Sequence, residues 1–223
     1  MHSYTYIIFD LDGTLSDPGE GIVNSLKHAL KHFGLEGDPK ILRKFIGPPL
    51  AESFKEFFNF DPEQTAEAIR LYRQYFHEFG LFQNVIYPGI PELLEDLAKA
   101  GNTLAIATTK PEVYAVQILE YFKIDHLFRK ELVVGSFLDG RRTNKGELIA
   151  TVLQRLGCSP QDAVMIGDRK YDIIGAKANH IDVIGITYGY GDVDEIEAFT
   201  PTAIAHSVEE LRQLLLPPHE LTE

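Results

Sequence analysis

The stretch YTYIIFDLDGTLSD, residues 4–17, places two aspartates, Asp10 and Asp12, directly after a short apolar run. Such a run is typical of a buried strand, and residues two apart in an extended chain point the same way. Gly13 then permits a sharp turn with exposed backbone N–H groups. Charged residues are seldom buried for stability alone. The stretch therefore favours a functional pair of carboxylates at a strand end over a turn cap beside a solvated aspartate.

Short apolar runs recur along the rest of the chain. After residues 6–9 they occupy residues 103–108, 131–134, 163–167, 183–187 and 203–206. They are continuous rather than alternating, which is typical of parallel strands covered on both faces. Helical patterns separate most of them, at residues 91–101, 111–124 and 145–157. This alternation predicts an α/β fold with a Rossmann-like core, an open and mostly parallel sheet.

One long interval interrupts the alternation, between the strand that ends near Asp10 and the next, which starts near Thr103. Helical patterns in this interval occupy residues 21–34, 38–47 and 61–80. Two of them begin with Asp-Pro, an N-cap followed by proline at the first helical position. We therefore expect a small helical-bundle domain at residues 17–83, inserted into a core domain made of residues 1–16 and 84–223.

The composition narrows the possible partners. The chain of 223 residues has a formal net charge of −12, which argues against nucleic acid or an anionic membrane as the main partner. We find neither a signal-peptide pattern nor an apolar run of about 18 residues. The single cysteine, Cys158, allows no internal disulfide, which weakly favours a reducing compartment. We expect a cytoplasmic protein with no membrane partner, and its oligomeric state stays open, a monomer being compatible.

Polar residues follow other predicted strands. Thr108 and Thr109 end one strand with hydroxyl groups suited to a phosphate oxygen. Lys145 opens a helix, Asp168 ends a further strand, and Asp172 lies four residues on, one helical turn away on the same face. Each has an ordinary explanation by itself, as a cap, a solvated lysine or an aspartate in the first turn of a helix. In an open α/β sheet, however, ligands bind beyond the carboxyl ends of the strands.

Taken together these residues suit phosphoryl chemistry. Three carboxylates from two strand ends suit Mg²⁺, a hard cation that prefers oxygen, and no cysteine or histidine at these positions favours zinc. An ionised carboxylate can attack phosphorus without a general base. Its charge would repel phosphate, so Mg²⁺ and Lys145 are needed to offset that repulsion. The second aspartate can protonate the leaving oxygen and later accept a proton from water.

The sequence also resembles a known family. The segment FDLDGTL, the strand end at Thr108, Lys145 and the segment GDRKYD match, in order, the four motifs of the haloacid-dehalogenase-like hydrolases. The insertion resembles the type-one helical cap of that superfamily. Stretches such as RKFIGPPLAESF and YGYG resemble its 5′-nucleotidase-like branch, a neighbour of the phosphoglycolate phosphatases. One departure is small: many relatives have Lys-Pro at the third motif, where this chain has NKGE.

The resemblance implies a role for each motif residue. Asp10 would be the nucleophile that forms an aspartyl-phosphate, and Asp12 the general acid and base. Thr108 and the Thr109 backbone would hold phosphate, and Lys145 would bridge Asp10 and phosphate.

The resemblance also implies a metal site. Mg²⁺ would be bound by the Asp10 side chain, the Asp12 carbonyl and Asp168. Asp172 would act through water or from outside the ligand sphere. The sheet order of the family would place the first and fourth core strands side by side, which brings Asp10 and Asp168 together.

These features predict a Mg²⁺-dependent phosphomonoesterase for a small phosphorylated metabolite, first of all a nucleoside 5′-monophosphate. Phosphoglycolate phosphatase is the main alternative. Haloacid dehalogenases lack the aspartate at Asp12, and no motif marks Lys44 or Lys55 as the cap lysine that a phosphonatase needs. A phosphomutase of the β-phosphoglucomutase type uses the same residues and stays open. A non-catalytic receiver-like phosphoacceptor is disfavoured by the long insertion.

Substrate choice is expected to depend on the insertion. The segment FIGPPL, residues 45–50, is either a plain helix break or a loop that dips toward the phosphate site around Gly47. In the second interpretation Arg43 or Lys44 would meet an anionic or hydrogen-bonding group of the substrate. Arg141 and Arg142 could do the same, but we expect them to be solvated.

Overall fold

The computed structural model describes residues 4–216 of the chain. The chain divides into two compact units, one made of Met1–Leu15 and Ile86–Glu223 and the other of Ser16–Val85. We call the first the sheet unit and the second the helical unit. The assignment of residues 17–83 as a helical cap domain stays a prediction.

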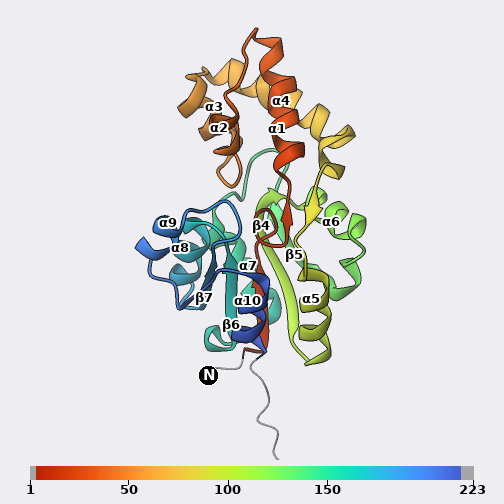
Figure 1. The fold of residues 1–223 in the computed structure, drawn as a ribbon, viewed down its shortest axis with the longest axis vertical. Coiled ribbons are helices and arrows are strands. Elements are labelled where there is room, and N and C mark those ends of the chain that lie inside the picture. Colours follow the sequence, from red (N-terminus) through yellow and green to blue (C-terminus); the bar gives the residue numbers. More distant parts are fainter. Residues whose placement is uncertain (1–3, 217–223) are drawn as a thin grey trace, which may run out of the picture. The chain divides into compact units, whose positions relative to one another are not determined.

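The sheet unit is built on six parallel strands (Figure 1). In spatial order they are β5 (Phe128–Ser136), β4 (Thr103–Pro111), β1 (Tyr6–Phe9), β6 (Ala163–Gly167), β7 (Asp182–Ile186) and β8 (Ala203–Ala205). In the central strand β1, Tyr6 pairs with Thr103 on one side and with Ala163 on the other. The predicted α/β fold class with a parallel Rossmann-like sheet is confirmed, as is the expected pairing of the strands at residues 6–9 and 163–167.

Helices cover both faces of this sheet. They are α5 (Ile90–Lys99), α6 (Glu112–Tyr121), α7 (Lys145–Leu156), α8 (Lys170–Ala178), α9 (Val193–Ala198) and α10 (Val208–Leu215), with the 3-10 turns η2 (Asp125–Leu127) and η3 (Pro160–Asp162). Helices α7 and α8 pack on the face that carries Ile8 and Met165, and these side chains are fully buried. Burying one such side chain contributes about 1.5–3 kcal/mol. The helix predicted at 111–124 is shorter because Pro111 belongs to β4 and Lys123 takes a positive φ of 58°.

The helical unit contains α1 (Gly19–His32), α2 (Pro39–Arg43), α3 (Leu50–Phe58), α4 (Pro62–Glu78) and the 3-10 turn η1 (Gly80–Phe82). Asp38 and Asp61 cap α2 and α4 as their Asp-Pro sequences predict. The core is largely aromatic: Phe54 stacks on Phe60 at 5.7 Å between ring centroids and meets Phe45 edge-on at 5.1 Å. None of the helices predicted from the sequence covers the residues of α3.

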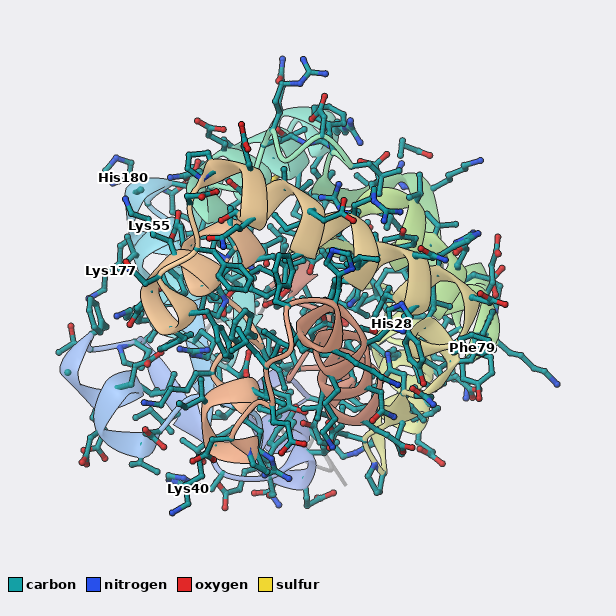
Figure 2. All side chains as sticks on the ribbon, turned by 90° about the horizontal axis from the view of Figure 1, so that it is seen from above. His28, Lys40, Lys55, Phe79, Lys177 and His180 are labelled. Carbon is teal, nitrogen blue, oxygen red and sulfur yellow. The ribbon has the colours of Figure 1, made fainter. Side chains whose placement is uncertain are left out.

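Two very short strands, β2 (Ser16–Asp17) and β3 (Val85–Ile86), pair with each other where the chain passes between the two units. Surface side chains in each unit point outward, as Lys40 and Lys55 do in the helical unit and Lys177 in the sheet unit (Figure 2). Among residues 4–216, no helix has the length and apolar character that crossing a membrane requires.

Candidate active site

The candidate site lies at the carboxyl ends of the three adjacent strands β4, β1 and β6. Asp10 follows β1 directly, and its backbone N–H donates to the Ile166 carbonyl of β6 at 2.9 Å. Asp168 follows β6, and Thr108 lies near the end of β4. Since parallel strands in register end at the same edge of a sheet, this pairing brings the polar residues of three strands together.

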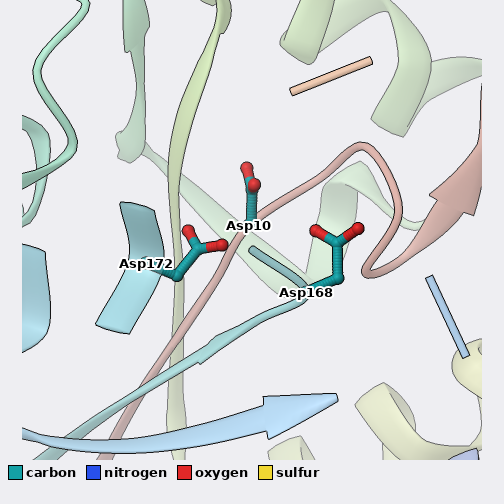
Figure 3. Close-up of side chains that lie close together, drawn as sticks. All are labelled: Asp10, Asp168 and Asp172. Atoms are coloured by element: carbon teal, nitrogen blue, oxygen red, sulfur yellow. The ribbon is translucent and has the colours of Figure 1, made fainter. Parts of the chain in front are cut away.

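Three buried carboxylates form the acidic part of the site. One oxygen each from Asp10, Asp168 and Asp172 lies within 4.8 Å of the other two (Figure 3). Asp172 is the third residue of α8, where its Oδ2 accepts the Arg169 N–H at 3.1 Å. Asp168 precedes this helix, so the sequence expectation of two aspartates on one helix face was wrong. The two carboxylates meet because a strand end and a helix start converge.

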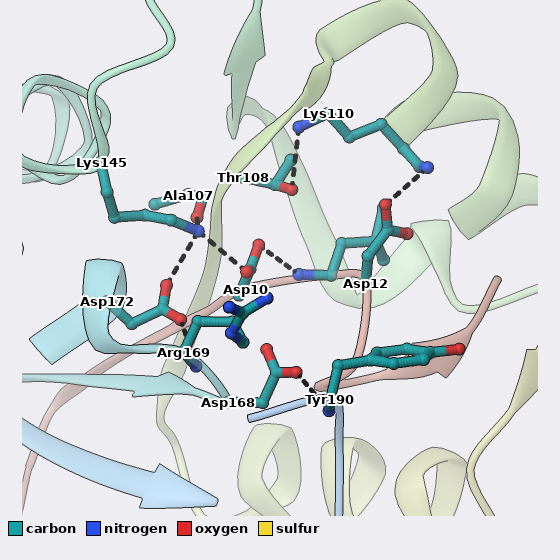
Figure 4. A network of polar contacts seen from close by, with 11 residues as sticks. Asp10, Asp12, Ala107, Thr108, Lys110, Lys145, Asp168, Arg169, Asp172 and Tyr190 are labelled. Carbon is teal, nitrogen blue, oxygen red and sulfur yellow. Dashed lines mark hydrogen bonds and ion pairs between the residues drawn. The ribbon is translucent and has the colours of Figure 1, made fainter. Parts of the chain in front are cut away.

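Lys145 holds two of these carboxylates together. Its Nζ lies 2.9 Å from Asp10 Oδ2 and 2.8 Å from Asp172 Oδ1, and it donates to the Ala107 carbonyl at 3.0 Å (Figure 4). It is the first residue of α7, after Asn144, whose side chain caps the helix. The NKGE sequence therefore delivers the lysine to Asp10 without the proline that many relatives have.

A second buried lysine, Lys110, pairs with the other aspartate of the opening stretch. Its Nζ pairs with Asp12 Oδ2 (Figure 4), at 2.6 Å, and its side chain is only 5% exposed. Its backbone N–H donates to Thr108 Oγ1 at 3.2 Å. Lys110 is not among the site residues predicted from the sequence. Its place two residues after Thr108 in the same strand was not a sufficient signal, because a lysine at a strand end is usually solvated.

The candidate phosphate-binding residues are close to this network. Thr108 is buried near the end of β4, and the half-buried Thr109 follows it in the same strand. Asp10 Oδ1 accepts the Leu11 N–H at 2.8 Å. This bond and the Lys145 ion pair fix the orientation of the Asp10 carboxylate.

The loop that follows β7 encloses Asp168. The Tyr190 N–H donates to Asp168 Oδ2 at 2.8 Å (Figure 4). Gly189 and Gly191 allow this close approach, because a Cβ on Gly191 would lie 1.9 Å from the Asp168 carbonyl oxygen. On the same loop the Tyr188 hydroxyl donates to the Thr14 carbonyl at 3.2 Å. The YGYG sequence thus places a backbone donor and two glycines beside Asp168.

Burial and crowding shift the protonation of these groups. The pKa of Asp168 is raised to about 8, because burial disfavours its charged form and the carboxylates of Asp172 and Asp10 repel it. Burial also raises the pKa of Asp172, to about 6, against the opposing effect of Lys145. Burial alone would lower the pKa of Lys145, but its two carboxylate partners outweigh this and raise it. The pKa of Asp12 is raised by burial, which Lys110 opposes.

The residues of this site fit a divalent cation. Asp168 Oδ1 is buried and has no hydrogen-bond partner within the described part of the chain. Four carboxylates face two lysines here, which leaves uncompensated negative charge whenever all four are ionised. Gly13 has a φ of 81°, and a Cβ there would lie 2.2 Å from Asp168 Oδ2. Buried oxygen ligands with excess negative charge are what Mg²⁺ requires.

The predicted specificity residues lie in the helical unit. Arg43 ends α2, Lys44 follows it with its Nζ 5.9 Å above the Phe57 ring, and Gly47 has a φ of 105° in the loop before α3. In the sheet unit, Arg142 was expected to be solvated, but its side chain is only 15% exposed.

Arg142 is held by its neighbours because three groups converge on its guanidinium. It pairs with Glu112 at 2.6 Å, donates to the Gly135 carbonyl at 2.8 Å and lies over the Phe137 ring. Arg141 is exposed, and pairs with Asp139 at 2.8 Å.

A parallel sheet that presents paired carboxylates and buried lysines at the ends of its central strands defines an α/β enzyme suited to phosphoryl chemistry. Comparison with known proteins identifies the family. Residues 7–186 match the family model described as haloacid dehalogenase-like hydrolase, and the chain belongs to this family.

Individual relatives and solved structures resemble this chain over most of its length. A 5′-nucleotidase from Pseudomonas aeruginosa is 45% identical over 213 residues, 95% of this chain and 96% of the relative. The tyrosine-protein kinase PtkA from Mycobacterium tuberculosis is 40% identical, with 94% of this chain and 72% of the relative covered. A crystal structure described as a predicted phosphatase from Clostridium acetobutylicum is 45% identical, with a TM-score of 0.90 and 96% and 99% of the two chains covered. The expected enzyme class, a phosphoric monoester hydrolase, is confirmed by the family and its phosphatase members.

Proposed function

We propose that this phosphatase depends on Mg²⁺ and hydrolyses small phosphate monoesters, with nucleoside 5′-monophosphates as the first substrate class, through an aspartyl-phosphate on Asp10. The observation that carries the proposal is the Asp10 carboxylate, held 2.9 Å from Lys145 and within the same cluster as Asp168 and Asp172. The similarity to a 5′-nucleotidase over nearly the whole chain supports the substrate class.

In the first step an Asp10 carboxylate oxygen attacks phosphorus, and the bond between phosphorus and the ester oxygen breaks. Asp12 gives its proton to the departing oxygen, so the alcohol or nucleoside leaves neutral. Thr108 and the Thr109 backbone receive phosphate oxygens, and Lys145 offsets the charge that accumulates between Asp10 and phosphate.

In the second step Asp12, now a carboxylate, takes a proton from water. The resulting hydroxide attacks the phosphorus of the aspartyl-phosphate, the bond from Asp10 to phosphorus breaks, and inorganic phosphate leaves. Each half-reaction returns Asp12 to the protonation state that the other half needs, which is why one residue serves as both acid and base.

We propose that Asp10, Asp168 and the Asp12 carbonyl hold the Mg²⁺, with Asp172, which lies in the same cluster, acting through water or from outside the ligand sphere. When bound, the cation would offset the negative charge of phosphate and of the carboxylates and orient the phosphoryl group. We further propose that the helical unit selects substrates, with Arg43, Lys44 and Gly47 as candidates.

Phosphate release from a panel of monoesters, measured with Mg²⁺ and with EDTA, tests the proposal. The panel contains nucleoside monophosphates, phosphoglycolate and sugar phosphates. We expect release that requires the metal and is strongest with nucleotides. A preference for phosphoglycolate would contradict the nucleotide assignment and leave the mechanism in place.

Two further results would contradict hydrolysis itself. Transfer of phosphate between two positions of a sugar phosphate would indicate a mutase, and a stable phosphoprotein without turnover would indicate a receiver-like role. Because a tyrosine kinase is among the similar proteins, ATP with a tyrosine-containing peptide belongs in the assay. Formation of phosphopeptide in place of inorganic phosphate would overturn the hydrolase proposal.

A further inference from the structure

The two buried lysines of the site are divided between its two functional aspartates. Lys145 lies against Asp10, the proposed nucleophile, and Lys110 against Asp12, the proposed acid and base. Both lysine side chains are at most 5% exposed. Buried charges of this kind are tied to specific partners, since an unpaired buried charge is costly.

The two oxygens of the Asp12 carboxyl group have different surroundings. Oδ2 lies 2.6 Å from Lys110 Nζ, whereas Oδ1 is buried without a hydrogen-bond partner among the described residues. A lysine ammonium can only donate, so Oδ2 must act as an acceptor whether Asp12 is ionised or neutral. The proton of a neutral Asp12 therefore belongs on Oδ1.

The position of Lys110 is itself fixed. It lies in β4, next to β1, and its backbone N–H is tied to the Thr108 hydroxyl at 3.2 Å. The ladder between β4 and β5 is irregular between Ala107 and Pro111, the stretch that contains Lys110. The strand end thus sets the lysine in place before any substrate arrives.

We propose that Lys110 is a positioning residue for proton transfer, which holds Oδ2 of Asp12 so that Oδ1 is the atom that gives and takes the proton. This inference rests on the proposed function, because it assigns an atom to a step of that mechanism. Lys110 acts through Asp12 and does not need to touch the phosphate.

The leaving group distinguishes this role from direct phosphate binding. A nucleoside 5′-monophosphate expels a poor, alkoxide leaving group that needs a proton. p-Nitrophenyl phosphate expels a phenolate that is stable without one. General acid–base catalysis contributes about 10²–10⁴-fold where the proton is needed. Comparing kcat/KM for the two esters reports on the first step, in which the leaving group departs.

The experiment compares Lys110→Met with the wild type on both esters in Mg²⁺. We expect a loss of about 10²-fold in kcat/KM for the nucleotide and of no more than about threefold for p-nitrophenyl phosphate. Lys110→Arg should restore part of the nucleotide activity, and the charge-removing control Lys99→Met, at an exposed position, should match the wild type. Equal losses on both esters would overturn the proposal.

A double-variant cycle gives a second measurement. If Lys110 acts through Asp12, the double variant Asp12→Asn with Lys110→Met should be no slower on the nucleotide than Asp12→Asn alone. Denaturant unfolding of the wild type, the two single variants and the double variant measures how the Lys110–Asp12 pair contributes to stability, independently of catalysis. Both single variants should be less stable than the double variant, because each leaves one buried charge without its partner.

Additive effects in both measurements would overturn the inference. A wild type that releases phosphate from neither ester would instead contradict the proposed function, so the two failures are distinguishable.

Discussion

At the scale of single residues, the strand end holds Asp10, the proposed nucleophile, in a fixed orientation. Its Oδ1 accepts a backbone N–H at 2.8 Å and its Oδ2 pairs with Lys145 at 2.9 Å. Bonds from charged and backbone donors stabilise the ionised carboxylate and hold it in one orientation. A reacting group that is already oriented loses less freedom on the way to the transition state.

Replacing Asp10 by asparagine tests this residue directly. Asp10→Asn keeps the size of the side chain and removes the ionised oxygen, so we expect kcat with a nucleoside monophosphate to fall by about 10³-fold or more. The fold should persist, because Lys145 keeps Asp172 and the Ala107 carbonyl as partners. The exposed Asp125→Asn serves as the matched control. Near-normal phosphate release by Asp10→Asn, with an unchanged circular dichroism spectrum, would exclude it as the nucleophile.

The residues of the site differ in how far the sequence reveals them. Asp10 and Asp12 stand two apart after an apolar strand, a local pattern with few structural explanations. Lys110 has no such local mark, since a lysine at a strand end is usually solvated and its partner Asp12 is distant in sequence. The sequence likewise does not reveal that Arg142 is held by other residues, because its partners Glu112 and Gly135 are not adjacent to it in the chain.

At the scale of elements, length decides what the sequence can predict. The runs at 6–9 and 163–167 are continuous and apolar, and both form the expected strands. Strands β2 and β3 have two residues each, too few for any periodicity, and only pairing defines them. Helix α3 follows two prolines, which signal a break more clearly than they signal the helix that begins at Leu50.

The loop with Gly189, Tyr190 and Gly191 yields a prediction at this scale. In Gly191→Ala the new Cβ would lie 1.9 Å from the Asp168 carbonyl oxygen, so the loop must move and the Tyr190 N–H must leave Asp168. Groups that orient a metal ligand are worth about tenfold or more in affinity. We therefore expect Gly191→Ala to bind Mg²⁺ at least about tenfold more weakly in isothermal titration calorimetry.

Gly101→Ala is the control for that experiment. Gly101 has a positive φ of 92° and no atom lies within 4 Å of a Cβ placed there, so Gly101→Ala adds backbone strain away from the site. Equal Mg²⁺ affinity in Gly191→Ala and the wild type would show that the loop does not orient Asp168.

At the scale of the whole molecule, the site links charge to stability. The chain carries a formal net charge of −12, and its sheet unit buries three carboxylates within 4.8 Å of one another. Such a cluster works against folding when it is fully ionised, and either protons or a cation can relieve it. The stability of the protein should therefore depend on pH and on Mg²⁺ together.

The sign of this dependence follows from Asp168, whose pKa is raised from 3.8 to about 8 in the folded protein. Between these values the folded state binds more protons than the unfolded state, so the metal-free protein loses stability as pH rises from about 4 to about 8. The proposed Mg²⁺ site requires the ionised cluster, so the cation should raise the unfolding temperature more at pH 8 than at pH 5. Thermal unfolding at both pH values, with Mg²⁺ and with EDTA, measures this difference. In Asp168→Asn it should largely disappear, because the titrating group and a proposed ligand are both gone. An equal Mg²⁺ effect at the two pH values in the wild type would mean that the cation binds away from this cluster.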